Sequence, residues 1–445
     1  MSTVPRRAIT CSLLALFLNL AFVVTFIPHI TASAPLVIFL AVFYIYANIA
    51  PSKGKSAERR VRILNGGYEL LLMSIICFSF EALAYAFILI KGPGIKTHIL
   101  IINAVVCAVF LFILLLNGIL RIFICSKQLG IMPKILLLLL WWMPIVNIAL
   151  LKKFLDVSGA EYNFTVKKEL LNADRKHDEL CKTKYPILMV HGIFFRDWKN
   201  FNYWGRIPEE LTGNGAVIYY GNQQSAASVE QCANELKTCI LKIVEETGCE
   251  KVNIIAHSKG GLDSRYAISC LGMGKYTASL TTINTPHYGC KYIGKILKKI
   301  PEKTILAIGN GYDSIFTRLG DDAPDFFGGL ANLTDRECGR LNEIMKDDPN
   351  VLYQSAGSRM RKASGAPFPL NLGYSIIKSA GEGGNDGLVP TKSMEWGNFL
   401  GVLNPKDKQG ISHGDVIDLW RKDMEGFDVC EFYVDLVHKL KMNGL

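Results

Sequence analysis

The stretch VNIIAHSKGGLDSRY, residues 252–266, places a serine between a run of apolar residues and two glycines. A serine hydroxyl attacks a carbonyl near neutral pH only with a base beside it, free access, and donors for the oxyanion that forms. A sharp turn from a strand into a helix provides that access, and it requires small residues two places before and after the serine. Ala256 and Gly260 occupy those places. The pattern therefore predicts Ser258 as a nucleophile.

A carboxylate and a histidine should follow this serine, because the order along the chain in such an arrangement is Ser, Asp or Glu, then His. Asp386 lies in the glycine-rich loop GEGGNDGLVP, and His413 lies in GISHGDVIDLW, a loop before a helical pattern. We expect Asp386 to orient His413, which acts as the base. His257 should point away from the nucleophile into packing behind the turn, and His287 and His438 should be structural.

The oxyanion needs two backbone donors. The turn places the N–H of Lys259 at a helix N-terminus, where unpaired donors and the helix dipole favour negative charge. The second donor should come from the loop after the first strand of the domain, which reaches the same end of the sheet. That loop, VHGIF, offers Gly192 for a close turn, Ile193 as the N–H donor and His191 to orient the loop. An ordinary turn at a strand end is the alternative.

Strands and helical stretches alternate around these residues. YPILMVHGIF predicts a short strand, residues 228–246 have a helical pattern, and KVNIIAHS predicts a second strand. Such alternation is typical of βαβ units around a parallel sheet. The predicted fold class of residues 185–445 is therefore α/β with a mostly parallel sheet.

The first third of the chain is much more apolar than this domain. Five apolar runs precede residue 152, each close to the ~17–25 residues with which a helix crosses a bilayer. The runs are 9–27, 34–50, 70–90, 99–120 and 135–151. Buried helices of a soluble domain are the alternative, but these runs have no charged face. We expect a bundle of about five transmembrane helices over 1–153 and a charged helical connector over 154–184.

Basic residues orient such a bundle, because Lys and Arg in short loops stay on the cytoplasmic side. They gather before the first run, after the second, and between the fourth and fifth: Arg6, Arg7, Lys53, Lys55, Arg59, Arg60, Arg62, Arg121, Lys127 and Lys134. Five crossings would place the rest of the chain outside a plasma membrane, although Lys152 and Lys153 argue against that side. The net charge of +10 is partly this orientation signal. The sequence contains no basic stripe with interleaved aromatic residues, so it does not predict nucleic-acid binding.

Six blocks of the chain occur together in an order that is specific to one family. They are YPILMVHG, YWGRIPEEL, KVNIIAHSKGGLDSRY, TTINTPHYG, NDGLVP and SHGDVID, within about 185–440. In this order they resemble the bacterial secreted true lipases of the α/β-hydrolase superfamily, closest to the thermostable branch with an A-H-S-x-G turn. The resemblance implies ester hydrolysis, commonly of acylglycerols, through an acyl-enzyme. It implies the site residues named above: Ser258, Asp386 and His413, with Ile193 and Lys259 as backbone donors.

The chain also departs from that family at its metal sites. The thermostable branch binds zinc through an aspartate before the turn and two histidines in an insertion; here Val229 stands in the aspartate's place and the insertion is missing. Other members bind calcium through an aspartate two places after the histidine, which Asp415 matches, but we find no partner carboxylate upstream of Asp386. We therefore expect no cofactor and no zinc, and leave calcium near Asp415 open. Residues 291–319 lie where such enzymes carry a lid, although a surface helix is an equal alternative.

These observations predict a membrane-anchored serine hydrolase that acts on lipid or other ester substrates at the bilayer. Acyl transfer or phospholipase activity by the same triad is one alternative, and a catalytically silent binding module is another. The twelve cysteines contain no CxxC pair, so a structural metal site is not expected and the redox state is left open. The sequence does not give the oligomeric state.

Overall fold

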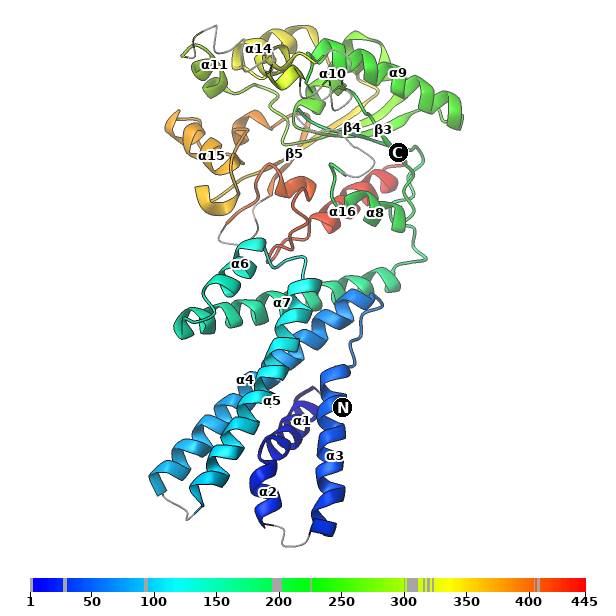
Figure 1. Ribbon diagram of the computed structural model, residues 1–445. Helices are drawn as coiled ribbons and strands as arrows, with labels where there is room; N and C mark the ends of the chain where they lie inside the picture. Colours follow the sequence, from blue (N-terminus) through cyan, green and yellow to red (C-terminus); the bar gives the residue numbers. More distant parts are fainter. Residues whose placement is uncertain are drawn as a thin grey trace. The chain divides into compact units, whose positions relative to one another are not determined.

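The chain divides into two compact units, Met1–Ala173 and Asp174–Leu445 (Figure 1). The computed structural model describes residues 3–26, 30–91, 95–193, 202–224, 226–299, 301, 311–314, 317, 321, 324–403, 405 and 409–445. Most of the connector that the sequence predicts over 154–184 belongs to a helix of the first unit, α7 (Pro144–Asp174).

The second unit is built on a parallel sheet, which has six strands in the described residues. The strands are β1 (Ile187–Val190), β2 (Ile218–Tyr220), β3 (Val252–His257), β4 (Thr277–Ile283), β5 (Leu352–Ser358) and β6 (Asn398–Leu403). They pair in the order β2-β1-β3-β4-β5-β6, and every pairing is parallel. The predicted α/β class with a mostly parallel sheet is confirmed. The strand order reverses direction between β1 and β3, and ligands of open α/β sheets bind beyond the carboxyl ends of strands at such a point.

Helices cover both faces of this sheet (Figure 1). The α-helices of this unit in the described residues are α8 (Ile207–Gly213), α9 (Val229–Thr247), α10 (Lys259–Cys270), α11 (Lys291–Leu297), α13 (Phe326–Ala331), α14 (Asp335–Ile344), α15 (Leu370–Ser379) and α16 (Val429–Met442). Successive strand side chains point to opposite faces. Ile187 and Met189 pack with residues of α8 and α16, whereas Leu188 and Val190 pack with residues of α9 and α10. The sheet is therefore buried on both faces, and only its ends are free to hold a site.

The first unit is entirely helical in its described residues. Its helices are α1 (Thr3–Leu18), α2 (Leu20–Phe26), α3 (Ile30–Ile49), α4 (Arg59–Lys91), α5 (Thr97–Cys125), α6 (Ile131–Leu139) and α7. Among the described residues, two helical stretches are long and apolar enough to cross a membrane, Arg59–Ile90 and Thr97–Cys125, and Ala34–Ile49 is a shorter apolar helix. Of the five spanning helices expected from the sequence, the described residues thus contain two of sufficient length and apolar character.

The fifth apolar run, 135–151, is the plainest departure. It is divided between α6, which ends at Leu139, and α7, which begins at Pro144. Proline lacks the backbone N–H and disfavours a helical conformation in the residue before it, but it suits the first position of a helix. Pro144 therefore starts a new helix instead of continuing the old one. The first run is likewise divided, between α1 and α2, at Asn19.

Polar side chains link the helices of the first unit at depth. Glu81 of α4 accepts a hydrogen bond from the side-chain amide of Asn19 at 2.7 Å. The amide nitrogen of Asn103 donates to Asn19 Oδ1 at 2.9 Å and to the Tyr85 hydroxyl oxygen at 2.8 Å. Polar residues inside apolar helix bundles commonly pair in this way. Glu81 is thus a partner in an interhelical network.

Candidate active site

Ser258 lies at the turn from β3 into α10 with φ 54° and ψ −131°. A positive φ is uncommon for a residue with a Cβ atom, and holding it costs on the order of 1–3 kcal/mol. The surrounding backbone fixes the turn: the Ser258 N–H donates to the carbonyl of Ile283 at 2.9 Å. The Ser258 carbonyl accepts from the N–H of Gly261 at 3.1 Å and from the Thr285 hydroxyl at 2.8 Å. This is the strained strand-to-helix turn that a serine nucleophile requires.

The loop after β1 touches this turn, and glycines permit the contact. A Cβ atom on Gly192 would lie 2.8 Å from the Cβ of Ser258, and one on Gly260 would lie 2.3 Å from the carbonyl oxygen of His191. Any larger side chain at either position would push the loop and the turn apart. The structure thus brings His191, Gly192 and Ile193 beside Ser258, where the sequence predicts the second oxyanion donor.

His191 ties that loop to the chain that follows β2. It is fully buried, and its Nδ1 and Nε2 lie 2.8 and 2.9 Å from the carbonyl oxygens of Gly192 and Gln223. The side-chain amide of Gln223 donates to the carbonyl of His191 at 2.9 Å. These contacts tie the loop after β1 to the chain that follows β2. Residues 194–200, which continue the loop, lie outside the described part of the chain.

Asp386 and His413 are in direct contact. Nδ1 of His413 lies 2.6 Å from Oδ2 of Asp386, and the His413 N–H donates to the Asp386 carbonyl at 2.9 Å. Oδ1 of Asp386 accepts the backbone N–H groups of Leu388 at 2.9 Å and Val389 at 2.7 Å. Asp386 is fully buried, so its charge is stabilised by these donors and not by water. This contact leaves Nε2 of His413 as the nitrogen that can exchange a proton with a nucleophile.

Asn284, to which the sequence analysis gives no role, positions this carboxylate. It follows β4 with φ 49°, is fully buried, and its side-chain amide donates to Asp386 Oδ2 at 2.7 Å and to the Ser358 hydroxyl at 2.6 Å. Asparagine tolerates the left-handed conformation better than most residues with a side chain. Its signal in the sequence is an asparagine directly after a buried strand, in TTINTPHYG.

Tyr203, also unassigned from the sequence, joins the oxyanion loop to the residue before the nucleophile. Its hydroxyl accepts from the N–H of Gly192 at 3.0 Å and lies 2.6 Å from Nδ1 of His257. The contact with Nδ1 fits a neutral His257 ring that accepts the proton of the Tyr203 hydroxyl. Burial lowers the pKa of His257 well below its ordinary value, and the nearby His413 ring lowers it further.

The placement of His257 therefore differs in part from expectation. It is buried, as expected, but it does not point away from the site. The centroids of the His257 and His413 rings lie 4.4 Å apart. His257 thus packs against the predicted base and supports its position. The expectation was wrong because a strand residue next to the turn can face the loop that carries His413, which local sequence does not show.

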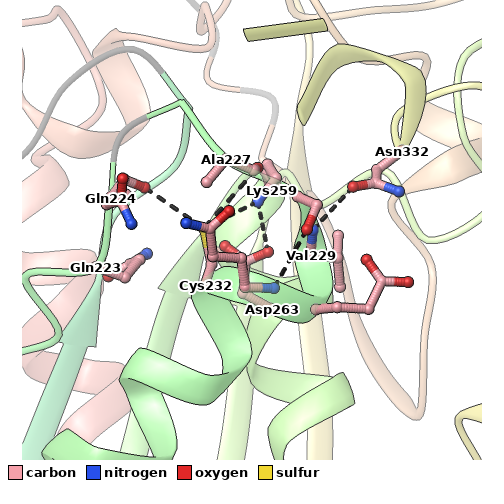
Figure 2. Close-up of polar contacts among 12 residues, drawn as sticks. Gln223, Gln224, Ala227, Val229, Cys232, Lys259, Asp263 and Asn332 are labelled. Carbon is pink, nitrogen blue, oxygen red and sulfur yellow. Dashed lines mark hydrogen bonds and ion pairs between the residues drawn. The ribbon is translucent and has the colours of Figure 1, made fainter. Parts of the chain in front are cut away.

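The side chain of Lys259 is buried beneath the turn (Figure 2). Its Nζ lies 2.7 Å from Oδ1 of Asp263 and 3.4 Å from Sγ of Cys232. Burial raises the pKa of Asp263 to about 6, against the opposing effect of Lys259. Burial is the largest single effect on Lys259 and disfavours its charged form, but the charges of Asp263 and Cys232 and the hydrogen bonds to them together raise the pKa of Lys259 above its usual value. The ammonium group is thus held by one carboxylate in a site without water access.

The remaining predicted residues take structural positions. His287 is buried, with Nε2 2.9 Å from the Thr282 hydroxyl, and His438 of α16 contacts the Leu180 carbonyl. Val229 is a buried apolar residue at the start of α9. Asp415 Oδ2 accepts from the N–H and hydroxyl of Ser412.

Two further expectations concern metal ions and a lid. Among the described residues, no group of three or more His, Cys, Asp or Glu side chains could hold a metal ion. Of the lid region expected over 291–319, α11 is described, whereas 300, 302–310, 315–316 and 318–319 lie outside the described residues.

Replacing Asn284 with alanine should lower kcat by about 10²-fold with little change in KM, because misplacing a catalytic group by ~1 Å costs about that much. The lost amide donor would leave Asp386 free to turn and would change the pH dependence of kcat. The measurement is a pH profile of ester hydrolysis by the purified chain. Asn350→Ala, an exposed asparagine of the same unit, should leave kcat unchanged. An unaltered pH profile and kcat in Asn284→Ala would contradict a positioning role.

Asp263→Asn should destabilise the chain more than Lys259→Met. The first variant leaves a buried ammonium group without its carboxylate, which costs about 3–5 kcal/mol. The second leaves a carboxyl group whose pKa burial already raises to about 6, so it can take up a proton instead. Lys259→Met also keeps the backbone N–H at that position. Thermal unfolding of the detergent-solubilised variants measures the order, and the reverse order would refute the burial argument.

The Lys259→Met variant should also lose stability as the pH rises. The folded pKa of Asp263 lies above the unfolded value of about 3.9, so the unfolded chain releases this proton first. The contribution of Asp263 to stability should therefore be complete below about pH 4 and be lost as the pH rises from there through the folded pKa, which lies above about 6 once Lys259 no longer lowers it. The double variant Lys259→Met with Asp263→Leu is the control and should lack this slope. A Lys259→Met chain as stable at pH 8 as at pH 5 would sink the prediction.

Comparison with known proteins agrees with the geometry. Residues 186–306 match the profile of the family described as "Putative serine esterase (DUF676)". A triacylglycerol lipase of Vibrio cholerae is 28% identical over 287 residues, which cover 59% of this chain and 90% of that protein. A triacylglycerol lipase of Pseudarthrobacter phenanthrenivorans is 30% identical over 177 residues. This match covers 37% of this chain and 55% of that protein.

Among solved structures, that of Staphylococcus hyicus lipase matches at 19% sequence identity and a TM-score of 0.47. The match covers 59% of this chain and 97% of the other. The second unit thus has a parallel sheet with a serine turn after β3, and its sequence is similar to those of lipases and serine esterases.

Proposed function

We propose that this protein is a membrane-anchored serine hydrolase that cleaves carboxylic ester bonds of lipids through an acyl-enzyme. The observation that carries the proposal is the strained turn at Ser258, with φ 54°, beside a loop that only glycine lets approach. A buried carboxylate in contact with a histidine supports it, because Asp386 and His413 complete the order Ser, Asp, His. A binding module would have no use for that combination.

In the proposed reaction, the Ser258 hydroxyl attacks the ester carbonyl while Nε2 of His413 takes its proton. Asp386 accepts the Nδ1 hydrogen and stabilises the imidazolium that forms. His413 then returns the proton to the departing alcohol, which leaves an acyl group on Ser258. A water molecule attacks this acyl-enzyme by the same route, with His413 again as the base, and the carboxylic acid is released.

The oxyanion of each tetrahedral intermediate would be bound by the backbone N–H groups of Ile193 and Lys259. The N–H of Lys259 is among the first of α10, and these groups have no acceptor within their own helix. The close contact of Gly192 with Ser258 supports Ile193 as the second donor, because it fixes the loop at the nucleophile. Such donors contribute about 3–4 kcal/mol each to transition-state binding.

Lipid esters are the proposed substrate class for two reasons. The relatives named above are triacylglycerol lipases, and the first unit contains helices long and apolar enough to cross a bilayer. An enzyme held at a membrane meets substrates that partition there. Acyl transfer by the same residues differs only in the acceptor that attacks the acyl-enzyme, so product analysis separates the two reactions.

The test is labelling with a fluorophosphonate probe on membranes that contain the intact chain, Ser258→Ala or Ser264→Ala. Ser264 is a buried serine of α10 whose hydroxyl bonds the Gly260 carbonyl, so it is a matched control. Label should be lost in Ser258→Ala alone. A folded, unlabelled wild-type chain would overturn the proposal.

Asp386→Asn should lower ester hydrolysis by about 10⁴-fold while the chain stays folded, because the amide favours the wrong tautomer of the histidine. The measurement is the hydrolysis rate on a series of p-nitrophenyl esters and diacyl lipids, with the free acid and any acyl-transfer product quantified. Wild-type rates in Asp386→Asn would exclude Asp386 from the reaction.

A further inference from the structure

We infer that the segment from Ile131 to Leu151 lies in the surface of the cytoplasmic leaflet without crossing the membrane, so that the hydrolase unit faces the cytoplasm. The inference rests on the membrane anchoring proposed above, but not on catalysis. It replaces the expectation of five crossings, which placed the α/β domain outside.

The segment is too short on either side of its break to span a bilayer. α6 has nine residues, and the part of α7 before Lys152 begins at Pro144. At about 1.5 Å per residue these pieces reach about 14 Å and about 12 Å, whereas the hydrocarbon core is ~30 Å thick. Four residues with no continuous helix, Leu140 to Met143, separate them.

The surface of this segment is apolar and unpartnered within the described first unit. Nine large apolar side chains are exposed along it: Ile131, Met132, Ile135, Leu138, Leu139, Trp141, Trp142, Ile145 and Ile148. Trp141 and Trp142 are 74% and 65% exposed at the break itself. Tryptophan is enriched where hydrocarbon meets headgroups, and helices of this kind bury their apolar face ~5–10 Å deep. The partner that fits this surface is a lipid leaflet.

The apolar surface continues toward the spanning helices. A cavity of about 890 Å³ lies between α4, α5 and the start of α7, and Ile148 lines it together with Phe112 and Leu115. Ile148 is therefore shared between the exposed surface and a cavity that faces the apolar lengths of α4 and α5. This continuity argues for lipid hydrocarbon, in preference to a soluble partner, as the occupant.

The rest of α7 is fixed to the basic ends of α4 and α5 (Figure 1). Glu161 of α7 accepts from the guanidinium of Arg60 at 2.6 Å and from the Ser126 hydroxyl at 2.7 Å. Glu169 accepts from the Ser56 hydroxyl at 2.7 Å. These partners lie at the start of α4 and the end of α5, where the chain's arginines and lysines gather. α7 thus lies at the same side of the membrane as those residues and does not lead away from it.

This placement also explains Lys152 and Lys153, which five crossings would have put on the outer side of the membrane. α4 and α5 contain the two stretches long and apolar enough to cross a membrane, and as two crossings they return the chain, after α5, to the side on which α4 begins. All basic connections then share that side, and Lys152 and Lys153 join them. Both lysines are exposed. The cytoplasmic side is the one that holds Lys and Arg in short connections.

The cysteines of the hydrolase unit are consistent with the cytoplasm. All eight are free thiols: Cys181, Cys232, Cys239, Cys249, Cys270, Cys290, Cys338 and Cys430. Five of them are buried and act as small apolar core residues. Disulfides form in exported proteins and are rare in the reducing cytosol. The substrates of the enzyme would then be lipids of the cytoplasmic leaflet.

The first experiment measures the depth of Trp141 and Trp142 in proteoliposomes of the full chain. Lipids brominated near the headgroup or near the acyl-chain end quench tryptophans at matching depths. The comparison is wild type against Trp141→Phe with Trp142→Phe, and Trp420→Phe, an exposed tryptophan of the hydrolase unit, is the matched control. We expect the double variant to lose mainly quenching by the shallow bromines. Loss mainly of deep quenching would overturn the inference, because a spanning run would centre both residues in the bilayer.

The second experiment finds the side of the hydrolase unit from native Cys270, which is exposed. A membrane-impermeant maleimide is applied to spheroplasts expressing the wild type or Cys270→Ser, before and after permeabilisation. Labelling that Cys270→Ser lacks should appear only after permeabilisation. The same labelling on intact spheroplasts would falsify the cytoplasmic placement.

Two controls separate this inference from the proposed function. Release of the chain from membranes by alkaline carbonate would overturn both the anchoring and the inference. A chain that keeps its membrane placement but takes no fluorophosphonate label would defeat the hydrolase proposal, while the placement would be upheld.

Discussion

The left-handed backbone of Ser258 is the constraint on which the candidate site depends. A residue with a Cβ atom keeps φ 54° only where its surroundings fix it, and here the end of β4 and the first turn of α10 bind its backbone on both sides. The strain turns the side chain toward the loop after β1. Gly192 and Gly260 are then required, because any Cβ atom there would meet the serine or the loop within contact distance. The strained conformation of Ser258 thus determines which residue types can lie next to it.

From this turn a chain of buried polar contacts leads around the site. The Tyr203 hydroxyl connects Gly192 to His257, the His257 ring packs on His413, and His413 bonds Asp386. Each contact is shielded from water, so each is stronger than it would be at the surface, and losing one partner would leave another buried group unsatisfied. The loops that carry Tyr203 and His413 are therefore held to the rigid end of the sheet, which is what a preorganised site needs.

The sequence predicts the parts of this arrangement that depend on local pattern. Small residues around Ser258, buried runs that form β1 and β3, and a carboxylate in a glycine-rich loop are each visible within about ten residues. The supporting residues are not, because their role depends on distant partners: Asn284 bonds a carboxylate 102 residues away, and Tyr203 reaches a histidine 54 residues away. Nothing local tells such a residue from an ordinary buried polar side chain. The same limit explains why His257 was expected to face away from the site.

The fifth apolar run shows the opposite limit, in which a local signal is present but composition outweighs it. Mean hydropathy counts apolar residues and ignores whether one helix can contain them, whereas Pro144 ends helical continuity in the middle of the run. Glu161 fixes the position of α7 relative to α4 and α5. Its buried carboxylate binds both Arg60 and Ser126, and so holds α7 across the ends of α4 and α5. Breaking these contacts is costly, because it would leave a buried carboxylate without partners. A segment that is apolar at its start and bound through charged groups at its middle favours the membrane–water interface, because only there can the apolar part contact lipid while the charged part stays near water.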